Sequence, residues 1–287
     1  MSIEIKNLSF IYDKGLSFEK TALINASAEV LEGEIVGIIG HTGSGKSTLI
    51  QHMNGLIKPL EKDKVFVDGE DLFDHKKEIH AICQKVGMVF QYPEMQLFEE
   101  TVEKDVGFGP KNLGLNEEEI QQRVIEALDM VDLDYEKMKN RQPFFLSGGE
   151  KRRVAIAGTL AMKPKYLILD EPTAGLDPFT REQILDEVMK INKEKGITII
   201  MVSHDMDEIS RLSDKLYVMH KGIVALSGKT KEVFAQYEKI SELGLMIPQV
   251  TEVLLGLSKC WKDIDYSIFN LDKAVKEIIR CRKSHGN

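Results

Sequence analysis

The sequence lacks three features that would each indicate a particular class of protein. Its three cysteines, Cys83, Cys260 and Cys281, show neither a pairing pattern nor metal-ligand spacing, so we expect reduced thiols in a cytosolic protein. No apolar run approaches the roughly 18 residues that a membrane span requires, so a membrane role would have to go through partner subunits. Residues 1–6 carry an early acid and alternate apolar with polar side chains, which indicates a strand and not a signal peptide.

The chain also has no excess of basic residues. Its net charge of −8 and pI near 5.5 argue against a nucleic-acid partner, because phosphate contacts need clustered Lys and Arg. Hydrophobic residues make up 43% and charged residues 29%, which is ordinary for a globular chain. A length of 287 residues favours about two domains, one of them large enough to bury a substantial core.

Short apolar segments alternate with helical stretches along most of the chain. Three nearly continuous apolar runs are typical of strands buried on both faces: 34–39, 165–170 and 197–202. Residues 219–224 resemble a late hairpin. This alternation predicts an α/β fold with a mostly parallel sheet and an antiparallel β edge.

Two regions depart from the alternation. Residues 101–163 are polar and mainly helical in pattern, with Asn116 as an N-cap and Glu119 three residues on. Beyond about Gln236 the sheet pattern stops. The tail ends in an amphipathic segment whose apolar face holds four side chains: Leu271, Val275, Ile278 and Ile279.

These patterns predict two domains. A nucleotide-binding domain would cover residues 1–235, with a helical subdomain over about 101–163. A small, mainly helical C-terminal domain would cover residues 236–287.

A glycine-rich turn follows the first apolar strand and opens a helix. It matches the Walker A phosphate-binding loop and comprises Gly40, His41, Thr42, Gly43, Ser44, Gly45, Lys46, Ser47 and Thr48. Glycines let backbone N–H groups and the positive helix end face an anion. Lys46 places a charge on the outer phosphates, and the Ser47 hydroxyl can ligate Mg²⁺. A chance glycine-rich turn is the alternative, but the strand before it and the helix after it favour an ATP site.

The second apolar run ends in two acids, which matches a Walker B strand. Asp170 would hold the Mg²⁺ shell, and Glu171 is placed to polarise the attacking water. An apolar strand ending in two acids is commonplace on its own. Here it lies downstream of a Walker A loop and is followed by Pro172-Thr173, which favours the catalytic interpretation.

A third motif, residues 146–153, separates the families that share the first two. Ser147, Gly148 and Gly149 precede a helix expected over Val154–Leu160, so they could form a second anion-binding helix start. The motif resembles the LSGGQ signature of the ABC ATPases, with Glu150 where glutamine is commoner. The resemblance implies that each signature faces the Walker A loop of an opposite subunit, with ATP between them. A serine-glycine turn before a basic helix is the alternative.

The remaining elements of the ABC family follow in order over residues 3 to about 235. The resemblance implies that Tyr12 stacks on adenine, although a core or surface tyrosine is the alternative. Gln91, after the strand expected over 86–90, matches the glutamine that contacts the metal and the attacking water. Asp177 matches the D-loop, and His204 matches the switch histidine that contacts the γ-phosphate.

Finer features resemble the energy-coupling factor (ECF) transporters, in particular the second of their two homologous ATPases. These features are residues 91–98, residues 203–208, the loop 13–20 and the C-terminal region. The resemblance implies a peripheral protein on the cytoplasmic face of the cell membrane, where ATP hydrolysis drives vitamin uptake. Its partners would be a homologous ATPase, a transmembrane coupling subunit and exchangeable substrate-binding membrane subunits. A nickel or cobalt importer ATPase and a non-transport ABC ATPase remain as alternatives.

Two surfaces carry further hypotheses. Five acids line residues 94–105 and could receive basic coupling helices of the membrane subunit, or could simply form a solvated face: Glu94, Glu99, Glu100, Glu103 and Asp105. The tail could hold the two ATPases together when no ATP is bound, or could pack on its own domain.

Overall fold

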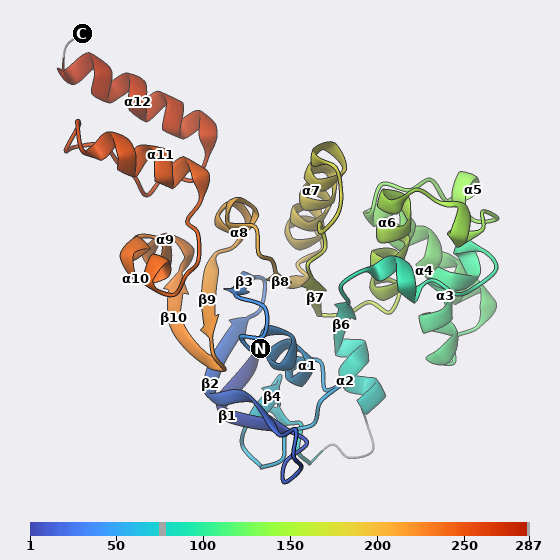
Figure 1. Ribbon diagram of the computed structural model, residues 1–287. Coiled ribbons are helices and arrows are strands. Elements are labelled where there is room, and N and C mark those ends of the chain that lie inside the picture. The colour runs from blue at the N-terminus through green and yellow to red at the C-terminus, as the bar shows by residue number, and fades with distance from the viewer. Residues whose placement is uncertain (75–78, 286–287) are drawn as a thin grey trace.

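The computed structural model describes residues 1–74 and 79–285 and contains two β-sheets with helices around them (Figure 1). The larger sheet has the strand order β10-β9-β3-β8-β7-β6. Its strands are β3 (Ile35–Gly40), β6 (Val86–Val89), β7 (Tyr166–Asp170), β8 (Thr198–Val202), β9 (Lys215–His220) and β10 (Ile223–Lys229). All neighbours in this sheet pair in parallel except β9 and β10. The mostly parallel sheet, its antiparallel edge and the late hairpin are therefore confirmed.

The smaller sheet is antiparallel, with the order β2-β1-β4-β5. Its strands are β1 (Ser2–Tyr12), β2 (Lys20–Leu31), β4 (Val65–Val67) and β5 (Glu70–Asp71). Helix α1 (Lys46–Met53) contributes Leu49, Ile50 and Met53 to a hydrophobic cluster that also contains residues of both sheets. The helix that starts at the Walker A loop is thus fixed between the two sheets, and α2 (Ile79–Lys85) leads into β6.

The polar stretch between β6 and β7 is helical, as predicted. It contains α3 (Val102–Asn112), α4 (Glu117–Met130), α5 (Tyr135–Met138) and α6 (Gly148–Leu160), with short 3₁₀ turns η1 (Pro93–Gln96) and η2 (Pro143–Phe145). The predicted cap of α4 is present as a capping box between Asn116 and Glu119.

The predicted start of α6 at Val154 was wrong by six residues. The helix begins at Gly148, because the Ser147 hydroxyl accepts from the backbone N–H of Glu150 and the Glu150 carboxylate accepts from the backbone N–H of Ser147. This reciprocal pair satisfies two orphan donors at the helix start. Glutamate at the fifth signature position therefore stabilises the start of the helix.

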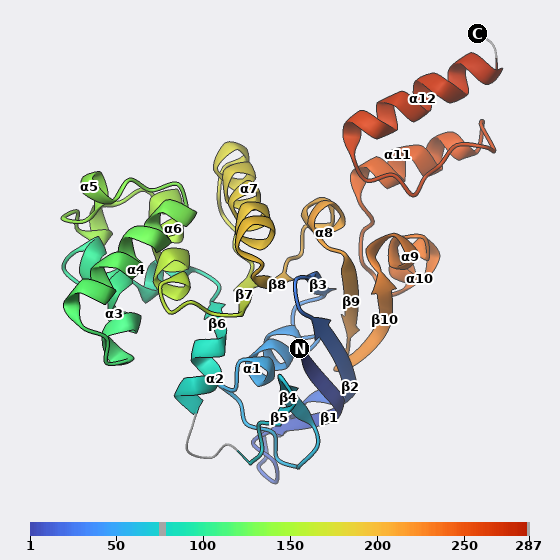
Figure 2. The ribbon, with the colours of Figure 1, turned by 180° about the vertical axis from the view of Figure 1, so that it is seen from behind.

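Beyond β7 and β8 lie α7 (Pro178–Lys195) and α8 (Met206–Leu212), and after β10 the chain continues as α9 (Thr230–Phe234), α10 (Tyr237–Glu242), α11 (Gln249–Ser258) and α12 (Leu271–His285). In both ribbon views α11 and α12 lie side by side, and α7, α8 and the larger sheet lie between them and α3–α6 (Figures 1 and 2). Ile240 belongs to the main hydrophobic core, whereas Leu254, Ile264, Ala274 and Cys281 form a separate cluster. The division after 235 stays a prediction, and this packing favours a division near Pro248.

The apolar stripe predicted for the tail is only partly buried in the structure. Ile278 packs on the cluster between α11 and α12. Leu271, Val275 and Ile279 are not part of that cluster, and they are 67%, 46% and 46% exposed. Within the described residues, no helix has the length and apolar character needed to cross a bilayer.

Candidate functional site

The Walker A loop joins the carboxyl end of β3 to α1 through backbone conformations that suit only glycine. Gly40 has φ +150° and Gly45 has φ +105°. A Cβ added to Gly40 would lie 2.3 Å from the carbonyl oxygen of Met219 on β9, and one added to Gly45 would lie 2.6 Å from that of Ala22 on β2. Neighbouring strands of both sheets therefore press on the loop, which fixes its shape before any ligand binds.

Lys46 is the first residue of α1, and its side chain turns back over the loop. Its Nζ donates to the carbonyl oxygens of Gly40 at 2.7 Å and His41 at 2.9 Å. Burial lowers the pKa of Lys46, and the charges of Glu171 and Asp170 act against that shift. The ammonium group thus lies between the loop carbonyls and two acids, where a phosphate group can take the place of the carbonyl contacts.

A cleft of 240 Å³ lies over this loop. The Tyr12 hydroxyl and the Thr48 hydroxyl are 3.2 Å apart at its wall, which fixes the ring predicted to stack on adenine. Twelve residues line the cleft: Tyr12, Lys20, Ala22, Thr42, Gly43, Gly45, Lys46, Ser47, Thr48, Gln91, Asp170 and Glu171. Most of the predicted nucleotide and metal residues therefore meet in one place.

Lys20 and Ala22 in this cleft were not predicted as site residues. Both lie on β2, where Lys20 pairs with Tyr12 across the antiparallel register. A hairpin assignment joining Tyr12 to Lys20 would have placed this lysine beside the adenine-stacking position. The sequence shows there only a loop over 13–20 whose closing strands are weakly marked.

The three predicted catalytic side chains converge on one carboxylate. Glu171 Oε2 accepts a hydrogen bond of 2.8 Å from Gln91 Nε2, and its Oε1 lies 3.4 Å from His204 Nδ1. Glu171 has φ +50°, and its backbone N–H donates to the Val202 carbonyl at 2.9 Å. The turn out of β7 thus holds the acid at the carboxyl edge of the sheet, where β6 and β8 also deliver Gln91 and His204.

Asp170, the last residue of β7, is a half-buried acid beside Glu171. Burial and the neighbouring Glu171 charge raise the pKa of Asp170 to about 6. Together with the Ser47 hydroxyl and the Gln91 amide, it supplies oxygen donors of the type that Mg²⁺ prefers. No group of three or more His, Cys, Asp or Glu suited to a metal occurs in residues 1–74 and 79–285, so a Mg²⁺ shell here would also need water or phosphate oxygens.

The signature residues lie outside this cleft. Ser147 and Gly148 are exposed at the start of α6, and no residue of the signature lines the cleft among the residues that the structure describes. Asp177 is also exposed and caps α7 by accepting from the backbone N–H groups of Phe179 and Thr180, each at 3.1 Å. The chain therefore presents half of the predicted composite site in its cleft and the other half on a free surface.

Arg152 connects these parts, although sequence reasoning did not single it out. It is 2% exposed and donates to the carbonyl oxygens of Pro172 at 2.6 Å and Ala174 at 3.0 Å, while Glu94 lies 3.4 Å away. It thus holds the start of the D-loop and the segment after Gln91 against the signature helix. A basic run after a turn is usually solvated, so no local pattern marks this buried role.

Comparisons with known proteins agree with this geometry. The family described as ABC transporter matches residues 23–174. Two curated relatives are energy-coupling factor transporter ATP-binding proteins EcfA2. The one from Clostridium perfringens is 52% identical over 283 residues, 98% of this chain and 99% of the relative, and the one from Clostridium tetani is 49% identical over 280 residues, 98% and 97% respectively.

Solved structures match as well. The cbiO1 protein from Clostridium perfringens, described as part of the ABC transporter complex cbiONQ, gives a TM-score of 0.74 at 40% identity and covers 86% of this chain and 96% of that one. The ATP-binding cassette MJ0796, a dimer bound to ADP and Pi, gives 0.70 at 32% identity, covering 79% and 98%. The chain belongs to the family of energy-coupling factor transporter ATP-binding proteins, and it is an ATP-hydrolysing subunit of an ABC-type importer.

Proposed function

We propose that this chain hydrolyses ATP with Mg²⁺ as one half of a heterodimer with a homologous ATPase, on the cytoplasmic face of a membrane transporter for vitamins or other micronutrients. The observation that carries the proposal is the divided site. The cleft holds the Walker A and Walker B residues, whereas Ser147 and Gly148 are exposed elsewhere on the chain. A second ATPase must then supply the signature that closes the nucleotide in this cleft, as the dimeric state of the solved relative supports.

The side chains around Glu171 have separate tasks in this proposal. The Glu171 carboxylate orients the attacking water and accepts its proton, and Gln91 holds that carboxylate by donating to it. His204, 3.4 Å from the same carboxylate, is positioned to contact the γ-phosphate. Lys46 exchanges its loop carbonyls for phosphate oxygens, and Asp170, Ser47 and Gln91 would hold Mg²⁺, which neutralises charge on the phosphates when bound.

Co-purification from the native membrane tests this function directly. We expect a homologous ATPase and membrane subunits to accompany the chain, and the ATPase activity of the purified complex to require both ATPases. Membrane subunits specific for nickel or cobalt would favour the metal importer. Recovery of the chain with no membrane subunit would contradict the transport assignment.

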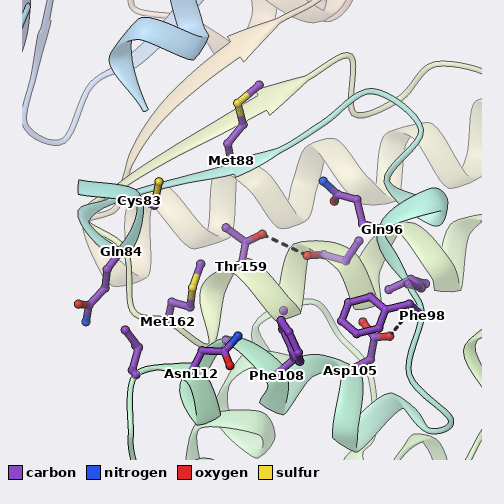
Figure 3. Close-up of a pocket in the computed structure, with 15 residues that line it drawn as sticks. Cys83, Gln84, Met88, Gln96, Phe98, Asp105, Phe108, Asn112, Thr159 and Met162 are labelled. Carbon is purple, nitrogen blue, oxygen red and sulfur yellow. Dashed lines mark hydrogen bonds between the residues drawn. The ribbon is translucent and has the colours of Figure 1, made fainter. Parts of the chain in front are cut away.

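A groove beside the predicted acidic surface offers a docking site for the transmembrane coupling subunit. It has a volume of 440 Å³, and the side chains drawn in Figure 3 come from α2, β6, α3 and α6 as well as the segment after Gln91. Phe98 and Phe108 stack edge to face at its mouth, 4.8 Å apart, and are 57% and 40% exposed. Apolar walls next to acids suit an amphipathic helix with basic residues.

Four of the five acids on the predicted acidic surface already have partners within the chain. Glu94 lies against Arg152, Glu100 pairs with Lys104, and Asp105 accepts from the backbone N–H groups of Phe98 and Glu99. The Glu103 carboxylate accepts from the Tyr135 hydroxyl. Within the described part of the chain, the Glu99 carboxylate has no hydrogen-bond or ion-pair partner, so it is the acid best placed to meet a basic helix.

Glu99→Lys is expected to weaken retention of the chain on the membrane subunits by about tenfold or more, because it replaces an attractive contact with a like-charge one. Pull-down of the assembled complex measures this loss. Glu61→Lys makes the same charge change at an exposed position after α1 and should leave retention unchanged. Equal retention of the two variants would leave the acids as a solvated face.

The exposed face of α12 offers a contact with the homologous ATPase that does not depend on ATP. Leu271, Val275 and Ile279 are spaced four residues apart and form one exposed apolar stripe, and the adjoining side of α12 already packs in the cluster with α11. ATP holds the catalytic faces together and must release them after hydrolysis. A second contact keeps the two chains at high effective concentration.

We expect Val275→Glu together with Ile279→Glu to weaken the affinity between the two ATPases in the absence of ATP by at least about tenfold. The reason is that two charges would be buried in the contact. Size-exclusion chromatography without nucleotide measures the pair. Leu60→Glu, at a position 63% exposed and outside the tail, is the matched control. These changes test the contact more cleanly than removing all residues after Gln236, which would also take Ile240 out of the main core. An undiminished pair would mean that the tail packs only on its own domain.

A further inference from the structure

A buried carboxylate on α8 joins the chain segments that carry Glu171 and His204, two of the three predicted catalytic residues. Glu208 is 4% exposed, and its Oε2 accepts hydrogen bonds from the Thr173 hydroxyl at 2.9 Å and the Ser203 hydroxyl at 3.0 Å. Thr173 and Ser203 are themselves buried. The three side chains thus form a closed polar contact inside the protein.

This contact involves residues that lie close to the proposed catalytic residues in the sequence. Thr173 lies two residues after Glu171, and Ser203 immediately precedes His204. The sheet holds these segments together only as far as the pair Asp170–Val202 and the bond from Glu171 N–H to the Val202 carbonyl. Beyond that point the two segments leave the sheet, and Glu208 is the side chain that bonds to both.

Ser203, which precedes His204, also bonds to Asp205, which follows it. Its hydroxyl donates to Glu208 and also accepts from the backbone N–H of Asp205 at 3.0 Å. Asp205 in turn caps α8 by accepting from the backbone N–H groups of Asp207 and Glu208. His204 is therefore held from both of its neighbours, although its own ring is exposed.

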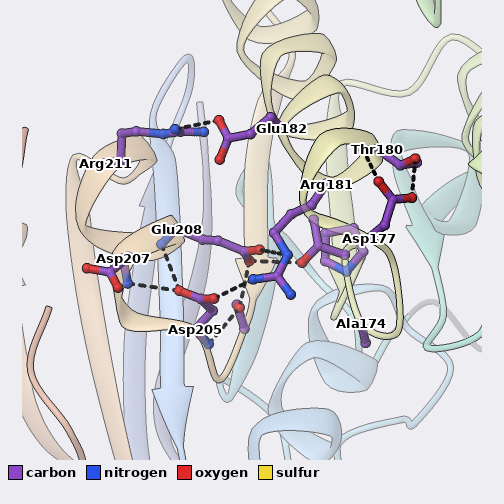
Figure 4. Close-up of polar contacts among 12 residues, drawn as sticks. Ala174, Asp177, Thr180, Arg181, Glu182, Asp205, Asp207, Glu208 and Arg211 are labelled. Atoms are coloured by element: carbon purple, nitrogen blue, oxygen red, sulfur yellow. Dashed lines mark hydrogen bonds and ion pairs between the residues drawn. The ribbon is translucent and has the colours of Figure 1, made fainter. Parts of the chain in front are cut away.

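Arg181 on α7 supplies the positive charge for this group of acids (Figure 4). It lies 2.9 Å from Asp205 and 3.5 Å from Glu208, and Figure 4 shows it reaching toward α8 from the helix that Asp177 caps. Glu182, the next residue, pairs separately with Arg211 at 2.7 Å. The D-loop helix is thereby connected to the same carboxylate as the two catalytic segments.

A purely structural role for Glu208 would be served better by an apolar residue. Burying a carboxylate costs free energy that its partners only partly return, and burial raises the pKa of Glu208. A hydrophobic residue at a core position of a short helix avoids that cost. A buried acid that bonds to two hydroxyls beside the site instead fixes the relative positions of the segments that carry them.

We propose that Glu208 is a positioning residue that sets the placement of His204 relative to Glu171 through its hydrogen bonds to Ser203 and Thr173. This rests on the proposed catalytic roles of Glu171 and His204. It goes beyond them, because Glu208 itself touches neither the cleft nor, by this assignment, the nucleotide. In the geometry of a shared catalytic centre, small displacements lower the rate of the chemical step far more than they lower substrate binding.

The experiment compares isosteric variants in the assembled transporter, with the matching change in the partner ATPase. Glu208→Gln is expected to lower kcat per bound nucleotide by about tenfold or more while KM for ATP stays within about twofold. An amide that still accepts from both hydroxyls must turn its NH2 group toward Arg181, and an amide whose oxygen faces Arg181 must turn its NH2 group toward the hydroxyls. Thr173→Val, which keeps the shape and removes the hydroxyl, should reproduce the loss, and Thr173→Ser should restore most of it. The double variant Glu208→Gln with Thr173→Val should be no slower than the slower single variant, since both changes disturb the same hydrogen-bonded group.

Two controls distinguish the positioning role of Glu208 from a general effect of losing one charge and from the catalytic assignment of Glu171. Glu182→Gln makes the same chemical change in an exposed pair and should leave kcat unchanged. Glu171→Gln tests the catalytic assignment itself, so near-normal turnover in that variant would remove the basis of the proposal. If Glu171→Gln is inactive while Glu208→Gln retains normal kcat, or if the losses at Glu208 and Thr173 simply add, only the positioning role is overturned. Should Glu208→Gln fail to fold, Thr173→Val against Thr173→Ser decides the question alone.

Discussion

Replacing Glu171 by glutamine is expected to leave ATP binding intact and to lower the turnover of the assembled transporter by on the order of 10²-fold or more. Glutamine preserves the shape and can still contact Gln91 and His204, whose atoms lie 2.8 and 3.4 Å from the present carboxylate. It cannot accept a proton from water. The loss should therefore fall on kcat and spare KM, as for a group that acts in the transition state.

The measurement is phosphate release by the purified complex with the change in both ATPases, beside equilibrium binding of a fluorescent ATP analogue. Asp186→Asn, an exposed acid on α7 away from the cleft, is a control for the loss of one negative charge. Near-normal phosphate release from the Glu171→Gln complex would reject the assignment of this residue as the catalytic base.

Gly40→Ala is expected to have the largest effect on the nucleotide loop itself. The added methyl group would lie 2.3 Å from the Met219 carbonyl oxygen and 2.7 Å from the Ser44 hydroxyl, at a residue with φ +150°. The Met219 carbonyl belongs to the backbone of β9 and cannot move aside at low energetic cost, so the loop must shift. We expect a loss of stability of about 3 kcal/mol or more and ATP binding weakened by at least about tenfold.

Denaturant unfolding without nucleotide and titration with ATP check these two effects. Gly33→Ala is the matched control, because Gly33 also has a positive φ of +83° but meets no atom within 4 Å. It should show only the left-handed strain, about 1–2 kcal/mol, with unchanged ATP affinity. Equal destabilisation of the two variants would show that the contact with β9 does not hold the loop.

Much of the fold could be predicted because its strands are buried on both faces. The runs that became β3, β7 and β8 are so continuously apolar that no polar periodicity competes with them. The start of α6 was missed even though Ser147 and Glu150 have the spacing of a capping box. The glycines between them favoured an irregular turn, and the helix there depends on a side-chain pair that outweighs their low helix propensity.

The site could be predicted where one short motif contains all its parts, and less well where contacts cross the sequence. The Walker A loop is contiguous, so its residues were found together, and six of the nine, Thr42, Gly43, Gly45, Lys46, Ser47 and Thr48, line one cleft. Lys20 enters through strand register, Arg152 through a buried helix face and Glu208 through contacts to residues 35 and five positions away. Such contacts depend on how the elements pack, which no local pattern records.

The cleft over the Walker A loop is separate from the exposed start of α6, and this separation determines how mutations in the two ATPases combine in their effects. In the proposed pair, a lesion at Lys46 damages the site built on this chain, whereas a lesion at Ser147 damages the site built on the partner. A Lys46 lesion here and a signature lesion in the partner therefore fall on the same site and spare the other. The same two kinds of lesion placed together in this one chain leave neither site whole, so cis and trans arrangements of identical defects are not equivalent.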